Sequence, residues 1–295
     1  MSLEVDWSNP YRNQQGEWRK GNLHAHTAPA SGCAHISAPD CLKTYARAGF
    51  DFLAISDHMT LTEVAAPGIA IVPGIEWNSA VGEHTGVYAA AWDDLRAVPA
   101  MDRQDALLAH LADKPVLVVL NHPNWGMVAH YAYEDLARCK HFDAIEAFNG
   151  VIGRLSGSAL AFEKWDQLLS AGRRVLGIGS DDSHFDTDIG KAWLHVRAAG
   201  CTPADILAGL RSGNFYGSTG ITLTRIVRKG GKFEIESPDA TEIRAIGEGG
   251  RVLGELRRPG AAFTFDASRV RSAYVRFAAL DERGGMAWTQ PFFRK

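Results

Sequence analysis

The sequence predicts an α/β protein built on a TIM-like barrel, followed by a small C-terminal β-rich module. Short apolar runs alternate with helix-like stretches from about Gly21 to Gly213, and this number of strand-helix units is typical of a barrel or of an open doubly wound sheet. Polar clusters rich in histidine and carboxylate stand at or just after the ends of these runs. Such side chains would meet at the mouth of a closed barrel, whereas an open sheet would leave its outermost strand ends too far apart. The barrel is therefore favoured.

The expected strands of this region are apolar runs that are continuous rather than alternating, as a parallel sheet buried on both faces requires. They cover residues 21–24, 52–56, 69–75, 86–91, 116–121, 144–148, 175–180 and 192–196. Helical patterns lie between them, over residues 39–48, 102–112, 158–170 and 203–210. Pro39 in a first turn, Gly49 as a stop and Thr202 as an N-cap mark helix ends.

The pattern changes after about Phe215, where helical periodicity disappears. Short strands between glycine-rich turns are expected over residues 221–227, 232–235, 242–246, 262–265, 273–279 and 287–292. We therefore divide the chain into an N-terminal extension (residues 1–19), a barrel domain (residues 20–214) and a C-terminal β-rich module (residues 215–295).

Composition indicates a compact enzyme and excludes several other classes. The 295 residues can bury a large core. The net charge is -3 and the lysines and arginines are dispersed, so no stable nucleic-acid partner is expected. The four cysteines form no CxxC pair, which favours reduced thiols in the cytosol. Residues 1–19 lack the apolar core of a signal peptide and no 18-residue apolar run occurs, so we expect a cytoplasmic protein without a membrane partner.

The histidines suggest a metal site assembled from many loops. His24 and His26 stand two apart at a strand end, where both side chains would point to one face and could bind one metal. Imidazole and carboxylate hold catalytic divalent metals while leaving a position open for water. Seven of the eleven histidines lie in such clusters: His24, His26, His35, His58, His84, His122 and His184. The remaining four are expected to be surface or core residues: His110, His130, His141 and His195.

Three carboxylates accompany these histidines. Asp57 could bind a metal directly, or could orient a ligand or cap a helix. Glu76 follows a buried-strand pattern in which a carboxylate is costly unless it is paired or metal-bound, so it is either a bridging ligand between two cations or a surface residue at a strand end. Asp182 stands two residues from His184 as a ligand pair, with Asp181 as the rival for its place.

Taken in order, these motifs resemble those of the polymerase and histidinol phosphatase (PHP) family over roughly Gly21 to Phe215. The residues that carry the resemblance are Asn22 to Thr27, Ile55 to His58, Pro73 to Glu76, His84, Asn121 to Pro123 and Gly179 to His184. The resemblance implies a distorted (β/α)7 barrel whose mouth holds two or three divalent metal ions, usually zinc, manganese or iron, and a metal-dependent phosphoesterase activity. It implies that the metal ligands are His24, His26, His58, Glu76, His84, His122, Asp182 and His184.

One motif departs from the family pattern. Many relatives carry a Ser-Asp-Gly after the His-x-His whose Asp is a ligand, but this chain has Ala30-Ser31-Gly32. The following Cys33-Ala34-His35 looks like the loop of those members in which a histidine takes the ligand role. We therefore include His35 among the candidate ligands, the alternative being that this loop is a solvent-facing lid over a two-metal centre.

The expected reaction is hydrolysis of a small phosphate ester by a metal-activated water. Glu76 would hold the metals together, and His184 or Asp57 would help to protonate the leaving group. One alternative is an amidohydrolase-type enzyme that cleaves a C-N or carboxylic ester bond, but no lysine ends a candidate barrel strand to form the usual carboxylated bridge. Another is a non-catalytic metal module, in which some of the metal ligands should have been lost, whereas this chain keeps nearly all of them. Candidate pocket-lining residues are Trp77, Asn124, Trp125, Asn149 and Arg154.

Overall fold

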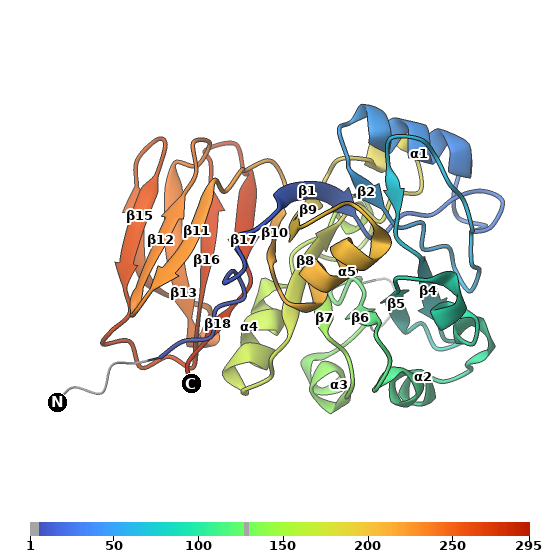
Figure 1. Cartoon of the computed structure of the whole chain (residues 1–295). Coiled ribbons are helices and arrows are strands. Elements are labelled where there is room, and N and C mark those ends of the chain that lie inside the picture. Colours follow the sequence, from blue (N-terminus) through green and yellow to red (C-terminus); the bar gives the residue numbers. More distant parts are fainter. Residues whose placement is uncertain (1–5, 127–129) are drawn as a thin grey trace.

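The computed structural model describes residues 6–126 and 130–295 and has a mixed α/β fold, as predicted. Figure 1 shows the C-terminal strands, in orange and red, packed beside a part that contains the α-helices. The first five residues of the predicted N-terminal extension lie outside the described residues. In the part of the chain that is described, no helix is both long and apolar enough to cross a bilayer.

The described residues of the helix-containing part form ten strands and five α-helices. The strands are β1 (Glu17–Asn22), β2 (Phe52–Leu53), β3 (Ala70–Ile71), β4 (Gly74–Asn78), β5 (His84–Tyr88), β6 (Leu117–Leu120), β7 (Ala144–Asn149), β8 (Leu176–Ser180), β9 (Trp193–Ala198) and β10 (Phe215–Ser218). The α-helices are α1 (Ala38–Arg47), α2 (Gln104–Leu111), α3 (Tyr133–Arg138), α4 (Phe162–Ser170) and α5 (Pro203–Arg211). Short 3-10 turns are η1 (Trp92–Leu95), η2 (Val98–Ala100), η3 (Val151–Arg154), η4 (Asp186–Asp188) and η5 (Glu248–Gly250). Of the α-helices, only the short α3 was not expected.

The helix ends follow the local sequence. At the start of α1, the side chain of Ser37 accepts a hydrogen bond from the backbone N–H of Asp40. The helix is followed by Gly49, whose φ of +75° is a left-handed conformation that favours glycine. At α5, Thr202 and Asp205 form a capping box. These local interactions account for the agreement between predicted and observed helix ends.

The predicted closed barrel is not found among the described strands. Strands β1 to β10 are divided between two sheets: β4-β5-β6-β7-β8, and a ten-stranded sheet that contains β9-β1-β2-β3. Single bridges join the sheets, between Ala25 and Ser183 and between His58 and Glu76. The strand pairing expected around a closed barrel is interrupted in two ways. Strands β2 and β3 are only two residues long, and β5 pairs with β4 in the antiparallel direction, with Asn78 opposite His84.

The expectation of an all-parallel sheet is also wrong. β1-β2-β3 and β6-β7-β8 are parallel, as predicted for buried apolar runs. However, β4-β5-β6 and β9-β1 are antiparallel. Continuous apolar character reports burial on both faces but does not specify strand direction, so the sequence pattern could not distinguish the two cases.

The C-terminal part is entirely β apart from the 3-10 turn η5. Its strands are β11 (Arg225–Lys229), β12 (Lys232–Glu236), β13 (Glu242–Gly247), β14 (Arg251–Arg257), β15 (Ala262–Asp266), β16 (Tyr274–Leu280), β17 (Met286–Thr289) and β18 (Phe292–Phe293). The single strand expected over residues 287–292 is two strands, and the largely polar β14 was not expected. Because β17 pairs with β10, one sheet crosses the boundary expected near residue 215. The division of the chain into three parts therefore stays a prediction.

The two ends of the chain share one hydrophobic cluster. Trp7 and Tyr11 are buried, with their rings 6.0 Å from Phe233 and 5.6 Å from Phe292 respectively. A bridge between Trp7 and Arg294 adds backbone pairing. In Figure 1 the blue N-terminal trace runs beside the red C-terminal strands. The N-terminal segment is thus part of the C-terminal β core.

A buried ion pair joins α4 to β16. Arg276 donates from Nε and Nη2 to the two carboxylate oxygens of Asp166, at 2.8 and 2.6 Å. Tyr274 also donates to Asp166, at 2.7 Å. The guanidinium lies over the rings of Phe162 and Trp165. Charge, hydrogen bonding and aromatic packing therefore coincide at this contact between the two parts of the molecule.

Candidate metal centre

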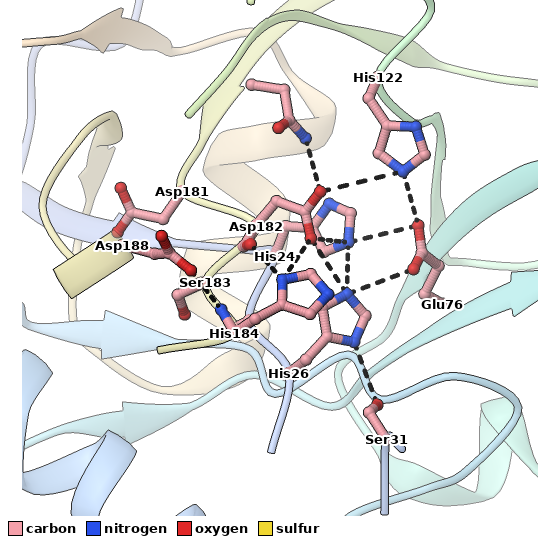
Figure 2. Close-up of polar contacts among 12 residues, drawn as sticks. His24, His26, Ser31, Glu76, His122, Asp181, Asp182, Ser183, His184 and Asp188 are labelled. Carbon is pink, nitrogen blue, oxygen red and sulfur yellow. Dashed lines mark hydrogen bonds and ion pairs between the residues drawn. The ribbon is translucent and has the colours of Figure 1, made fainter. Parts of the chain in front are cut away.

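The loops after several strands bring the expected ligand side chains together. Figure 2 shows His24, His26, Glu76, His122 and Asp182 directed toward one another. His24 and His26 follow β1, His122 follows β6, and Asp182 follows β8. The structure describes four groups whose ligand atoms lie within 4.8 Å of one another: His26, His58 and His184; His24, His122 and Asp182; His24, His26 and Glu76; and His58, Glu76 and His84.

Glu76 lies at the centre of this cluster. It is inside β4 rather than after a strand, and it is fully buried. Its carboxylate oxygens lie 3.0 to 3.3 Å from nitrogens of five imidazoles: His24, His26, His58, His84 and His122. Burial would raise the pKa of Glu76, but the surrounding imidazoles outweigh it and hold the pKa well below its usual range. An exposed position at a strand end is therefore wrong for this residue.

Asp182 and Asp181 face different surroundings. Asp182 Oδ1 lies 3.2 Å from Nε2 of both His24 and His26, and its backbone has a left-handed φ of +52°. Asp181 instead accepts backbone N–H groups of residues 190, 191 and 192 at 2.6 to 2.8 Å, and burial raises its pKa to about 6. The structure therefore places Asp182 in the cluster and Asp181 behind it.

The donors of the cluster fit divalent cations. Among the described residues, the buried atoms His58 Nδ1, Glu76 Oε2 and Asp182 Oδ1 lie close to other atoms of the cluster but make no well-directed hydrogen bond, although native proteins pair nearly all such atoms. His24 Nε2 and His26 Nε2 face each other at 3.0 Å. Converging imidazole nitrogens and carboxylate oxygens are the ligand types that zinc, manganese and iron accept.

Glu146 contacts the cluster, and the sequence interpretation missed it. Its Oε1 lies 2.8 Å from His24 Nδ1, and its Oε2 accepts the backbone N–H of His122 at 2.7 Å. Asn149 Nδ2 lies 2.7 Å from Glu146 Oε2 and 3.1 Å from Asp182 Oδ2. A carboxylate inside the apolar run of residues 144–148 has the same high burial cost that identified Glu76, and this cost could have pointed to it.

Asp57 lies outside the cluster and contacts it through Ser31. It accepts hydrogen bonds from the backbone N–H of Thr27 at 2.6 Å and from Ser31 Oγ at 2.7 Å. Two further hydroxyls, of Thr27 and Thr62, donate to its other oxygen. Ser31 Oγ in turn lies 3.2 Å from His26 Nδ1. With both oxygens occupied, Asp57 belongs to none of the four described ligand groups.

His35 lies apart from the other candidate ligands. Its side chain is exposed, and its ring stacks on Phe185 at 4.4 Å with an interplanar angle of 11°. It is absent from the four groups found in the described residues. By contrast, His130, expected to be a surface or core residue, is buried with its ring 4.6 Å from that of His122 and 5.3 Å from that of His84.

A pocket of about 290 Å³ opens beside the cluster. Two of the five expected lining residues, Trp125 and Arg154, line it. Trp77 is fully buried, Asn149 contacts Glu146, and Asn124 donates to the backbone of Leu160. A larger cavity of about 800 Å³ lies between the turn after β4, helix α2 and the segment around α3.

Comparisons with solved structures show the fold. A two-domain protein from Bacteroides vulgatus that contains a predicted PHP-like metal-dependent phosphoesterase is 13% identical, with a TM-score of 0.55 over 99% of each chain. The lesion-specific endonuclease EndoQ from Pyrococcus furiosus is 10% identical, with a TM-score of 0.53 over 66% of this chain and 56% of its own. Neither a scan of protein-family models nor a search of curated proteins finds a match. The PHP resemblance read from the sequence is confirmed at the level of the fold.

Proposed function

We propose that this chain is a metal-dependent phosphoesterase that hydrolyses a small phosphate ester. The observation that carries the proposal is the convergence of eight side chains into the overlapping ligand groups beside one pocket. These proposed ligands are His24, His26, His58, Glu76, His84, His122, Asp182 and His184. The PHP-like fold of the neighbours supports the same class of hydrolase.

The ligand groups suggest more than one ion. Two of them share Glu76 but differ in their histidines: His24 with His26, and His58 with His84. We therefore propose two or three divalent ions, of zinc, manganese or iron. Such ions supply Lewis-acid chemistry when bound, lowering the pKa of a water and neutralising charge on the phosphoryl group. Glu76 and Asp182 would balance the positive charge.

Of the two candidate proton donors, His184 is better placed. Its ring lines the pocket and its side chain is 15% exposed, so it can face the oxygen of a departing alcohol, and it would donate a proton there only in a state in which its ring does not bind a metal. Asp57 does not line the pocket, and its oxygens are taken by Thr27, Ser31 and Thr62. We assign Asp57 the role of orienting His26 through Ser31.

The alternatives have less support. An amidohydrolase would use a lysine bridge, and no lysine is among the described residues that line the pocket. A non-catalytic module would not need such a complete set of ligands. The neighbour EndoQ is named as a lesion-specific endonuclease, but the small pocket and dispersed charge of this chain favour a small-molecule phosphate ester as substrate. The proposed cytoplasmic location rests on the sequence alone.

The test combines elemental analysis with a substrate screen. Purified protein should contain at least two equivalents of transition metal, hydrolyse some phosphomonoesters or phosphodiesters, lose that activity on chelation and regain it with zinc, manganese or iron. Carboxylic esters and amides serve as comparison substrates. Less than one equivalent of metal with no uptake on addition would overturn the site assignment, and turnover of amides alone would favour the amidohydrolase alternative.

A further inference from the structure

We infer that the apolar wall of the metal pocket binds an apolar, ring-bearing group on the alcohol of the substrate, and that His35, Phe185 and Arg154 form the rim that selects it. We call these three residues the rim stack. The inference rests on the proposed phosphoesterase function and adds the substrate class. It also gives His35 a role other than metal ligation.

The pocket lining has two chemically different parts. One part is made by the proposed metal ligands, and the other is largely apolar. The loops after β6, β7 and β8 supply this apolar part, whose members are Trp125, Val151, Ile152, Leu155 and Phe185. A phosphate ester has the same division, because its phosphoryl group is anionic and its alcohol can be apolar. The pocket can therefore accept both ends of one molecule.

Two residues of the apolar part are unusually exposed. Leu155 and Phe185 each keep 37% of their surface accessible, and they are two of the five large apolar side chains exposed in the described part of the chain. Apolar surface left in water beside a polar cluster is typical of a ligand-binding groove. Its burial by an apolar group would be favourable, whereas a hydroxyl against the same wall would lose its hydrogen bonds to water.

Within the rim stack, His35 and Arg154 hold the Phe185 ring in place. His35 stacks on it at 4.4 Å, and Arg154 Cζ lies 5.1 Å from its centroid. Asp188 anchors this arrangement, because it accepts two bonds of 2.8 Å from the Arg154 guanidinium. It also accepts the backbone N–H groups of His184 and Phe185 at 3.0 and 3.1 Å. Figure 2 shows Asp188 beside His184. The ring is thus fixed before a ligand arrives, which lowers the entropy lost on binding.

The geometry favours a single ring rather than a long chain. The pocket volume of about 290 Å³ is at the lower end of the roughly 300 to 1,000 Å³ of ligand sites. Aromatic side chains at two positions, Trp125 and Phe185, can make edge-to-face or stacked contacts with a planar group. A phosphomonoester of a ring-bearing primary alcohol fits these constraints.

The experiment compares benzyl phosphate with ethyl phosphate, which differ by a phenyl in place of a methyl group and share a primary-alcohol leaving group. The parent enzyme should show a kcat/KM at least tenfold higher for benzyl phosphate. Phe185→Ala should reduce this ratio about tenfold or more, and Phe185→Tyr should restore it. Leu155→Ala should also lower the ratio, whereas Leu160→Ala is the matched control, because Leu160 is exposed but does not line the pocket.

The rim variants separate selectivity from metal binding. His35→Ala and Arg154→Met should lower the benzyl to ethyl ratio while metal content stays at the parent value. Arg154→Met keeps an unbranched side chain but removes the bonds to Asp188. Loss of about one metal equivalent in His35→Ala would overturn our assignment of His35 and return it to the ligand set.

A binding measurement keeps this inference distinct from the proposed reaction. Titration calorimetry with benzylphosphonate and ethylphosphonate needs no turnover, and we expect the benzyl compound to bind at least tenfold more tightly to the metal-loaded protein. If phosphate esters are hydrolysed but both ratios are near one and insensitive to Phe185→Ala, the inference fails and the phosphoesterase stands. If no ester is hydrolysed but benzylphosphonate is preferred, the apolar wall stands and the proposed reaction fails.

Discussion

Glu146 Oε1 lies 2.8 Å from His24 Nδ1, while the other nitrogen of the same ring lies 3.0 Å from His26 Nε2. A carboxylate at Nδ1 favours the tautomer that carries its proton there and presents a lone pair from Nε2. Glu146 therefore directs His24 toward the centre of the cluster. The same carboxylate binds the backbone N–H of His122, so it positions two of the proposed ligands.

We expect Glu146→Gln to weaken metal affinity by about 10- to 100-fold, because an amide orients the ligand imidazole less strongly than a carboxylate does. Competition against a chromogenic chelator measures this directly. Glu134→Gln, on the exposed surface of α3, is the control and should bind metal as the parent does. Equal affinity in all three proteins would exclude Glu146 from the positioning role.

Asp182→Asn and Asp181→Asn should fail in different ways. Asp182→Asn removes a charged oxygen that faces His24 and His26, so metal content and activity should fall while the metal-free protein keeps its stability. Asp181→Asn disturbs a carboxylate that accepts three backbone N–H groups, which should cost about 1 to 3 kcal/mol of unfolding free energy. Urea titration and elemental analysis of both variants check this. The reverse pattern would mean that the register of this loop is wrong by one residue.

Asp166→Ala should be strongly destabilising. It leaves the buried guanidinium of Arg276 without a counter-charge, a change that typically costs about 3 to 5 kcal/mol. Glu234→Ala is the control, since it breaks the partly exposed pair with Arg225 and exposed pairs contribute little. Chemical denaturation at neutral pH compares the two. Equal losses would show that burial of the Asp166 pair has no special energetic role.

His195 should make stability depend on pH. Burial, with a smaller contribution from the charge of Lys20, lowers the pKa of His195 from 6.5 to about 4. Between these values the unfolded chain binds a proton that the folded protein excludes, so the stabilisation is present above about pH 6.5 and is lost as the pH falls toward 4.

His195→Gln keeps an acceptor for the indole N–H of Trp193 but does not titrate. Its unfolding free energy should therefore fall less between pH 7 and pH 4.5 than that of the parent. Urea denaturation of the metal-free proteins at both pH values measures the difference. An identical loss in parent and variant would contradict the assignment.

The positions of most candidate ligands could be predicted because they depend on strand ends. Apolar runs that stop abruptly before His122 and Asp182 became β6 and β8. The ends of neighbouring parallel strands meet at one edge of a sheet, whatever the details of the connections. The sequence could therefore indicate a common site before any contact was known.

The remaining features depend on contacts between distant residues. The loop that carries His35 is held by a bridge between Ala28 and Ser37 and by a hydrogen bond from the backbone of His35 to that of His184. Neither contact is visible in the local pattern, so a ligand position and a rim position were equally compatible with the sequence. Strand direction was ambiguous for the same reason. An apolar run has the same sequence pattern whether it is parallel or antiparallel to its neighbour, and β4 and β5 are antiparallel.

The shared cluster of the chain ends has a consequence for biosynthesis. Trp7 and Tyr11 leave the ribosome long before their partners Phe233 and Phe292. At about 5 to 20 residues per second, the interval between Tyr11 and Phe292 is roughly 15 to 60 seconds. During that time the two nascent aromatic rings have no native burial site and are available to chaperones. The edge of β10 that β17 covers stays open for a shorter time, because the two strands are closer in the sequence. Translation speed should therefore affect the yield of correctly folded protein.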